Sequence, residues 1–172
     1  MWESIPPSAN SVTQQQKLKW SNITIGQDVK NNVLLATDFT WTVHSPSHGL
    51  SAIYPGIDHT LNSYYGSYLL LKNESPRKVG DRAVIMSDRY DISKSKALCL
   101  RFFYWLKNVG SIQTNSKLGV YQSENYTNVR KIGEYSGLTN TWASVNITIV
   151  PENTSSTDMW IYLVSYILII IF

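Results

Sequence analysis

The sequence has little of the material from which cross-linked, nucleic-acid-binding or coiled-coil proteins are built. The 172-residue chain contains one cysteine, Cys99, so it forms no disulfide within itself. Charged residues make up only 16% of the chain, and the net charge of +3 is scattered instead of forming the basic stripe that binds nucleic acid. Runs rich in Ala, Glu and Lys are missing, which excludes a coiled coil. At 43% hydrophobic residues the chain is too apolar to be disordered. It is also long enough to bury a hydrophobic core without disulfide bonds or a structural metal.

The sequence also lacks the motifs that carry common catalytic chemistry. It contains no nucleophile elbow, no His-Glu-x-x-His, no phosphate-binding glycine loop and no Cys-x-x-Cys. Cys99 stands in the most hydrophobic segment of the chain, where a thiol is inert and not nucleophilic. The three histidines, His44, His48 and His59, show no zinc-ligand spacing. We therefore predict no catalytic residue and no cofactor, and the sequence leaves the binding of a cation open.

The segment Asp58-His59-Thr60 allows a chemical and a structural interpretation. An Asp that orients a His forms half of a catalytic triad, but no nucleophile stands near this pair in the sequence. An Asp that follows Pro55 and Gly56 in a turn instead accepts hydrogen bonds from backbone N–H groups. We prefer the structural interpretation.

Short apolar stretches are separated by clusters of Gly, Asn, Ser and Pro, and Tyr, Trp, Thr, Val and Ile are abundant. This pattern is typical of an all-β sandwich, and no segment before residue 159 has a sustained 3.6-residue apolar period. We predict strands at residues 33–36, 39–43, 67–71, 82–86, 97–106, 117–121 and 142–150.

Two of these predicted strands define the expected core. Residues 142–150 alternate between apolar and polar side chains, so one face should point inward and the other, with Asn146, outward. Residues 97–106 are apolar on both faces and should lie in the middle of the sandwich. The residues that we expect to form the core motif are Trp41, Cys99, Leu100, Phe102, Tyr104 and Trp142.

Five Asn-x-Ser/Thr sequons suggest that the chain enters the secretory pathway. The sequon at Asn73 is the weakest, because Pro76 follows its serine directly. A single cysteine taken alone argues for a reducing compartment, so the two observations conflict. We predict glycosylation at Asn22, Asn125, Asn146 and Asn153.

Both ends of the chain are unusual for a secreted domain. Residues 1–17 have neither a basic nor an apolar signal region, and we expect them to be poorly ordered. Residues 151–172 form a polar linker and an apolar tail, in which Ser165 is the only clearly polar residue after 158. As a helix, residues 159–172 would span about 21 Å, less than the roughly 30 Å of a hydrocarbon core. A clipped membrane helix, an anchor signal and an unusual last strand are the alternatives.

Several segments stand in an order and spacing that carry a resemblance. The strongest is Cys-Leu-Arg-Phe-Phe-Tyr-Trp-Leu at 99–106. The others are Asp-Phe-Thr-Trp at 38–41, Pro-Gly-Ile-Asp-His-Thr at 55–60, Gly66 with Tyr-Leu-Leu at 68–70, Gly-Asp-Arg-Ala at 80–83 before Met86 and Ser87, Leu-Gly-Val at 118–120, and residues 133–149. Together they resemble the MAM domain, the adhesion module named for meprin, the A5 antigen and a receptor tyrosine phosphatase. The resemblance covers about residues 18–150.

The chain departs from the family pattern at both ends of this region. The family usually has four cysteines in two disulfides, whereas the early cysteine is replaced here by Leu18-Lys19-Trp20. The late cysteine and the closing Asp-Asp segment are missing, so the family partner of Cys99 is absent. We interpret residues 18–150 as a truncated MAM-like domain, a fragment or isoform of a larger protein. We predict that residues 159–172 do not replace the closing strand, and that they associate with a membrane or aggregate.

The resemblance implies a jelly-roll-like antiparallel β-sandwich that acts as an extracellular or cell-surface adhesion module. Its partner would be another protein or the same domain on a neighbouring cell, and it would not be an enzyme. The alternatives are a carbohydrate-binding jelly roll, since the chain has 11 Tyr and 6 Trp, and an accessory domain of a secreted protease.

Overall fold

The fold is known from a computed structural model, which describes ten stretches of the chain. These are residues 3–4, 20–22, 38–46, 54–71, 80–93, 97–106, 116–124, 127–139, 141–153 and 155–166. The predicted strand at 33–36 and the asparagines Asn73 and Asn125 lie outside the described residues.

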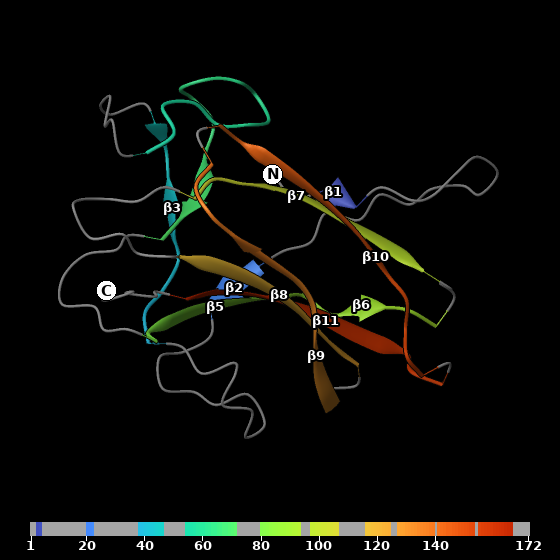
Figure 1. Cartoon of the computed structure of the whole chain (residues 1–172). Helices are drawn as coiled ribbons and strands as arrows, with labels where there is room; N and C mark the ends of the chain where they lie inside the picture. The colour runs from blue at the N-terminus through green and yellow to red at the C-terminus, as the bar shows by residue number, and fades with distance from the viewer. Residues whose placement is uncertain are drawn as a thin grey trace.

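The described residues form eleven strands and no α-helix, which confirms the predicted all-β class (Figure 1). Six of the seven strands predicted from the sequence overlap strands of the structure. The seventh, at 33–36, lies outside the described residues. The strands are β1 (Glu3–Ser4), β2 (Trp20–Asn22), β3 (Thr42–His44), β4 (Tyr68–Leu70), β5 (Arg82–Ser87), β6 (Tyr90–Asp91), β7 (Leu98–Tyr104), β8 (Lys117–Glu124), β9 (Thr127–Ser136), β10 (Ala143–Ile149) and β11 (Asp158–Tyr166).

The strands form two principal sheets and one small one. The smaller principal sheet has the order β1-β7-β10, and the larger has the order β2-β5-β11-β8-β9, with β6 paired to the other end of β11. Strands β3 and β4 make a separate pair, and every strand pair is antiparallel. The result is the antiparallel β-sandwich that the sequence predicted.

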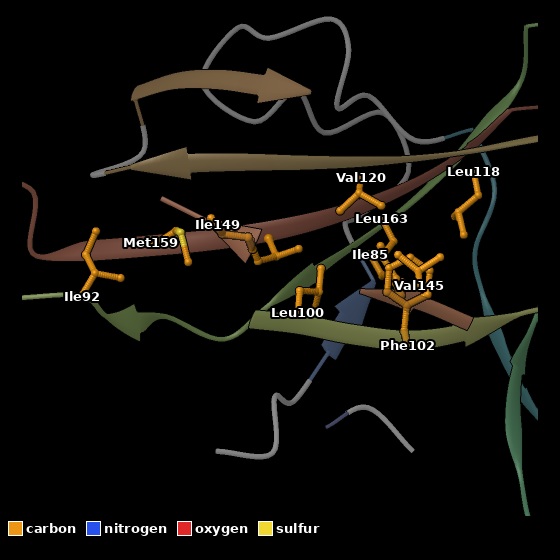
Figure 2. Close-up of a cluster of buried hydrophobic side chains, with 11 residues drawn as sticks. Ile85, Ile92, Leu100, Phe102, Leu118, Val120, Val145, Ile149, Met159 and Leu163 are labelled. Atoms are coloured by element: carbon orange, nitrogen blue, oxygen red, sulfur yellow. The ribbon is translucent and has the colours of Figure 1, made fainter. Parts of the chain in front are cut away.

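The core lies between the two principal sheets (Figure 2). Leu100 and Phe102 of β7 point from the smaller sheet toward Val120 and Leu163 of the larger one. All four side chains are at most 3% exposed. Transfer of each such side chain out of water contributes about 1.5–3 kcal/mol, so this layer supplies the main stabilisation of the fold.

Strand β10 shows the predicted alternation. Val145 and Ile149 are buried in the core, while Ser144, Asn146 and Thr148 are exposed on the opposite face. The register pairs Val145 with Phe102 of β7, so the inward faces of the two strands coincide. This agreement follows from the two-residue period of a strand with one buried and one solvated face.

Residues 38–41, which precede β3, are tied to β5 by backbone and side-chain contacts. Phe39 forms a parallel bridge with Ala83, and the Arg82 amide donates a 2.8 Å hydrogen bond to the Asp38 carboxylate. The Trp41 indole N–H donates to the Ala83 carbonyl at 3.2 Å. Trp41 also packs against the main core, so this segment covers the end of the sandwich.

Strand β11 overturns the prediction that residues 159–172 stay outside the sandwich. Asp158–Tyr166 pairs with β8 on one side and with β5 and β6 on the other, which makes it a central strand. Met159, Ile161 and Leu163 enter the core between the sheets, whereas Trp160, Tyr162 and Val164 are buried on the opposite face. The prediction was wrong for these residues, and residues 167–172 lie outside the described ranges.

The physical reason is that the larger sheet is buried on both faces at this strand. A strand that is buried on both faces has a continuous apolar sequence, without the alternation of apolar and polar residues that is expected of a half-solvated strand. The boundary drawn at residue 150 therefore separated β11 from the sheet to which it belongs. The side chains at 159–165 are buried in protein and are not available to a bilayer.

A buried carboxylate holds the turn that leads into β11. One Glu124 oxygen accepts hydrogen bonds from the Gln122 amide at 2.8 Å and the Glu152 N–H at 2.7 Å, and the other accepts from the Asn153 N–H at 3.2 Å. Burial is the largest single influence on the Glu124 pKa and raises it. Hydrogen bonds from the two backbone N–H groups and from the Ser156 and Gln122 side chains outweigh burial and lower the pKa below its ordinary value of 4.5.

This arrangement predicts an acid-sensitive stability. Because the folded pKa is below the unfolded one, the stabilisation is complete above about pH 4.5 and is lost as the pH falls through the lowered value. We expect Glu124→Gln to cost about 1–3 kcal/mol at neutral pH and to flatten the stability profile between pH 5.5 and 3. Urea unfolding at a series of pH values measures both. The control is Glu134→Gln, an exposed carboxylate paired with Lys117 and Lys131. An equal effect of the two variants would contradict the special role of Glu124.

Candidate interaction surface

Residues 54–66, here called the Asp58 loop, fold around one buried carboxylate. Asp58 is 3% exposed, and its two oxygens accept hydrogen bonds from the Leu61 N–H at 2.9 Å and the Ser63 N–H at 3.2 Å. The Asp58 N–H donates in turn to the Ser63 carbonyl at 3.1 Å. These bonds confirm the interpretation of Asp58 as a turn residue that satisfies backbone amides.

Two backbone positions allow the loop to close around this carboxylate. Asn62 adopts a left-handed conformation with φ of 49°, which Asn tolerates better than most residues. Gly66 is buried directly against Asp58, and any side chain at position 66 would collide with the carboxylate. The loop is therefore built for one conformation.

Aromatic side chains attach the Asp58 loop to the outer face of the smaller sheet. The His59 ring stacks on Phe103 of β7, with centroids 3.3 Å apart and an interplanar angle of 15°. The Trp142 indole N–H, next to β10, donates to the Ile57 carbonyl at 3.2 Å. Trp142 also makes an edge contact with Trp105 at 5.8 Å. The loop is thus fixed to both β7 and the start of β10.

A further attachment lies at the base of the loop. The Tyr68 hydroxyl of β4 donates to the Pro55 carbonyl at 2.9 Å, and its ring contacts Trp142 edge-on at 5.6 Å. His44 of β3 packs against Tyr54 and Tyr68 at 5.7 and 5.3 Å. Burial, with a smaller influence of Tyr54, raises the pKa of Tyr68 to about 12, so the hydroxyl stays a donor at physiological pH.

The electrostatic surroundings of His59 favour its neutral form. The partial loss of hydration against Phe103 lowers the pKa of His59 most, although the residue is exposed overall, and the positive charge of Arg101 lowers the pKa further. The neighbouring Asp58 carboxylate opposes them but does not prevail. In this structure the Asp58 carboxylate accepts backbone hydrogen bonds of the loop, and the His59 ring packs on Phe103.

The end of the loop presents apolar and aromatic side chains to solvent. Tyr65 is 88% exposed, Leu61 60% and Tyr64 54%. We call these three residues the aromatic tip. Residues 60–67 contain no charged side chain. A rigid loop that keeps large apolar groups in water is suited to contact a partner, because little ordering entropy is lost on binding.

Sequence reasoning did not single out the aromatic tip. The strand predicted at 67–71 matches β4, but the exposure of Tyr64 and Tyr65 before it was not predicted. The available signal was the polar Asn62-Ser63 pair followed by Gly66, a combination typical of a turn.

The residues of the predicted core motif occupy both faces of the smaller sheet. Leu100 and Phe102 are buried, and Tyr104 and Trp41 are partly buried against the same core. Trp142 lies on the other face with the Asp58 loop. Cys99 is a half-buried free thiol in β7, opposite Thr148 of β10.

The sequon asparagines differ in their surroundings. Asn146 is exposed on β10, with its threonine Thr148 exposed on the same face. Asn153 is exposed, and its side-chain oxygen accepts bonds from the Ser155 N–H at 2.9 Å and hydroxyl at 2.7 Å. Asn22 lies in β2, which pairs it with Ile85 of β5.

Within the described ranges, no group of three or more His, Cys, Asp and Glu side chains is arranged to hold a metal ion. The same ranges contain no helix that is long and apolar enough to cross a membrane. His48 lies outside them, while His44 and His59 take part in aromatic packing. The arrangement of the described residues is suited to binding a partner at the aromatic tip of the Asp58 loop.

Comparison with known protein families shows what the chain is similar to. The family described as MAM domain, meprin/A5/mu, matches residues 32–166. The match runs from before β3 to the last residue of β11, so it includes the strand that the sequence interpretation had left out.

Proposed function

The chain belongs to the MAM domain family, and from this premise we propose that it is a non-catalytic extracellular module that binds another protein through the aromatic tip. MAM domains are in general extracellular adhesion and interaction modules without catalytic activity, and they occur in secreted and cell-surface proteins. The part of the proposal that is specific to this chain is the assignment of the aromatic tip as its binding surface.

The observation that carries the proposal is the exposure of Leu61, Tyr64 and Tyr65 on a loop with so many internal bonds. Tyrosine supplies a large contact area with few rotatable bonds, and it is enriched where proteins bind each other. The Asp58 hydrogen bonds and the His59 stack fix the loop before any partner arrives. Binding would then proceed by burial of the tip in a complementary uncharged surface.

A carbohydrate partner is the alternative. Sugar binding requires aromatic faces that are open to solvent, and Tyr64 and Tyr65 offer them. Trp142 and Trp105 do not, because they contact each other edge-on and Trp142 also bonds the loop backbone. An uncharged tip is suited to a different protein on a neighbouring cell and to a second copy of the same domain alike.

The test is saturable binding of the secreted domain, coupled to beads to raise its avidity, to intact cells. Treatment of the cells with protease should abolish binding, whereas treatment with glycosidases should leave it intact. Loss of binding after glycosidase treatment alone would support the carbohydrate-binding function. Absence of binding to any of a panel of cell types, and to beads that carry the same domain, would contradict the adhesion function.

We further predict N-glycosylation of Asn146 in protein recovered from a secreting host. The side chain is exposed on β10 and points away from the core, so a glycan costs no packing. Peptide mapping after enzymatic deglycosylation measures the occupancy. Thr148→Ala, which removes the sequon without touching the core, is the control and should leave Asn146 unmodified. Unmodified Asn146 in the secreted wild-type protein would contradict the prediction.

A further inference from the structure

We propose that an N-glycan on Asn146 limits the access of large partners to the aromatic tip, because it stands on the same face of the smaller sheet as the Asp58 loop and next to it. The glycan acts on access alone and leaves the conformation of the loop unchanged. This effect requires the predicted modification of Asn146, and only its consequence for partner binding rests on the proposed function.

The outward-facing side chains of β7 and β10 form cross-strand rows on this face. Asn146 stands opposite Arg101, and Ser144 stands opposite Phe103 in the next row. Asn146 and Ser144 are both exposed. Two residues of a strand span about 7 Å, so the attachment point of the glycan lies about 7 Å along β10 from the row of Phe103.

The Asp58 loop covers the rows on one side of Asn146. His59 stacks on Phe103 with ring centroids 3.3 Å apart. The Trp142 indole N–H donates to the Ile57 carbonyl at 3.2 Å, and Figure 1 shows the loop beside the start of β10. The contact of the loop with the sheet therefore reaches the row of Phe103, which is next to the row of Asn146.

The surroundings of Asn146 leave room for a glycan. Asn146 and Thr148, the first and last residues of the sequon, are exposed on the same face. In the part of the chain that the structure describes, β10 is an edge strand that pairs only with β7. The Arg101 guanidinium leans toward the loop, with its carbon 5.2 Å from the centroid of the Phe103 ring. A bulky, hydrated glycan can therefore stand over this row and extend beside the loop.

A large partner has to cover more surface than the tip itself offers. A specific protein interface buries about 800 Å² on each partner, whereas two tyrosines supply about 300–500 Å² when they are fully buried. Tyr64 and Tyr65 are 54% and 88% exposed, so the rest of the interface must come from the surface around the Asp58 loop. The row of Asn146 borders that surface, and a glycan on it excludes part of the partner. A small molecule that touches only one ring meets no such obstacle.

The experiment compares the reaction of two maleimides, one small and one that carries a long polyethylene glycol chain, with a cysteine placed in the tip. The reporter is Tyr65→Cys in a chain that also carries Cys99→Ser, secreted by a host that attaches N-glycans. A matched form adds Thr148→Ala, which removes the sequon of Asn146. The small maleimide should react with both forms at the same rate, whereas the long-chain maleimide should react several-fold faster with the form that lacks the sequon.

Two controls make the result specific. Ser155→Ala removes the sequon of Asn153, which follows the far end of β10, and should leave both rates unchanged. The exposed Ser136 of β9, in the larger sheet, is the second reporter position. A Ser136→Cys reporter should react equally with and without the Asn146 glycan.

Several results would overturn the proposal. These are unmodified Asn146 in the secreted protein, equal long-chain rates with and without Thr148→Ala, and an equal increase of that rate on Ser155→Ala. A changed rate of the small maleimide would show that Thr148→Ala alters the loop itself, and it would overturn the proposal as well.

The cell-binding assay supplies the second readout. Beads that carry the Thr148→Ala protein should associate with cells several-fold faster than beads that carry the glycosylated wild type. Equal association rates of the two forms would overturn the proposal. If neither form binds any cell while the long-chain maleimide still discriminates between the reporter forms, the proposed function fails and the shielding by the glycan stands.

Discussion

Removal of residues 158–172 is expected to leave the chain without a cooperative unfolding transition. The deletion takes away β11, the strand that pairs with β5, β6 and β8 in the middle of the larger sheet. Six large apolar side chains of this strand are at most 4% exposed. At about 1.5–3 kcal/mol each, their burial is comparable with the whole net stability of about 5–15 kcal/mol of a typical domain.

Circular dichroism during heating measures this outcome. The control lacks only residues 167–172, and it should melt cooperatively because the family match ends at residue 166. If the chain without residues 158–172 melts with the midpoint of the full chain, β11 is not part of the folded core. The tail would then be a foreign terminus, as the apolar run alone suggested.

Truncation of Phe102 to Ala should be the most damaging single substitution in the smaller sheet. Phe102 is fully buried, pairs with Val145 in register and meets the Tyr135 ring edge-on at 5.9 Å. The cavity and the lost transfer free energy together cost about 3–5 kcal/mol. At about 2–4 °C per kcal/mol, the melting midpoint should fall by roughly 6–20 °C.

The adjacent residue provides the matched control. Phe103 faces the opposite side of β7, where it is partly exposed and holds His59. Phe103→Ala should therefore cost less stability than Phe102→Ala while loosening the Asp58 loop. A Phe102→Ala protein with a nearly unchanged midpoint, or a larger loss in Phe103→Ala, would remove Phe102 from the core.

The sequence predicted β7 and β10 well because each leaves a local pattern. A strand with one solvated face alternates, and Asn146 between Val145 and Ile147 reports that face directly. The sequence could not place β11, because an unbroken apolar run is shared by membrane segments and by strands buried on both faces. Only the pairing with β5 and β8 separates these cases.

Strand β9 was missed for a different reason. Its register with β8 shifts so that Val120 faces Gly133 and Tyr121 faces Lys131, which leaves Ile132 as an extra residue. A bulge of this kind changes the phase of the alternation, so Ile132 and Tyr135 both reach the core three positions apart. No simple period-2 pattern remains in the sequence.

The candidate site was predictable in its hydrogen bonds but not in its exposure. The position of Asp58 after Pro55 and Gly56 indicated a turn with a carboxylate that accepts backbone bonds. The strand that follows was predicted at 67–71 and is β4 in the structure. Whether Tyr64 and Tyr65 are buried depends instead on how the preceding loop packs on Phe103 and Trp142, and these contacts between distant segments leave no local pattern.

The most direct test of the account is the cell-binding affinity of the double variant Tyr64→Ser, Tyr65→Ser. The control carries Leu138→Ser and Val150→Ser, which removes exposed apolar side chains of 62% and 54% exposure outside the Asp58 loop. Two aromatic anchors at about 2 kcal/mol each predict a loss in affinity on the order of a thousandfold for the tip variant, with an unchanged melting midpoint. The control should bind like the wild type. A folded tip variant that binds with wild-type affinity would contradict the assignment of the aromatic tip as the binding surface.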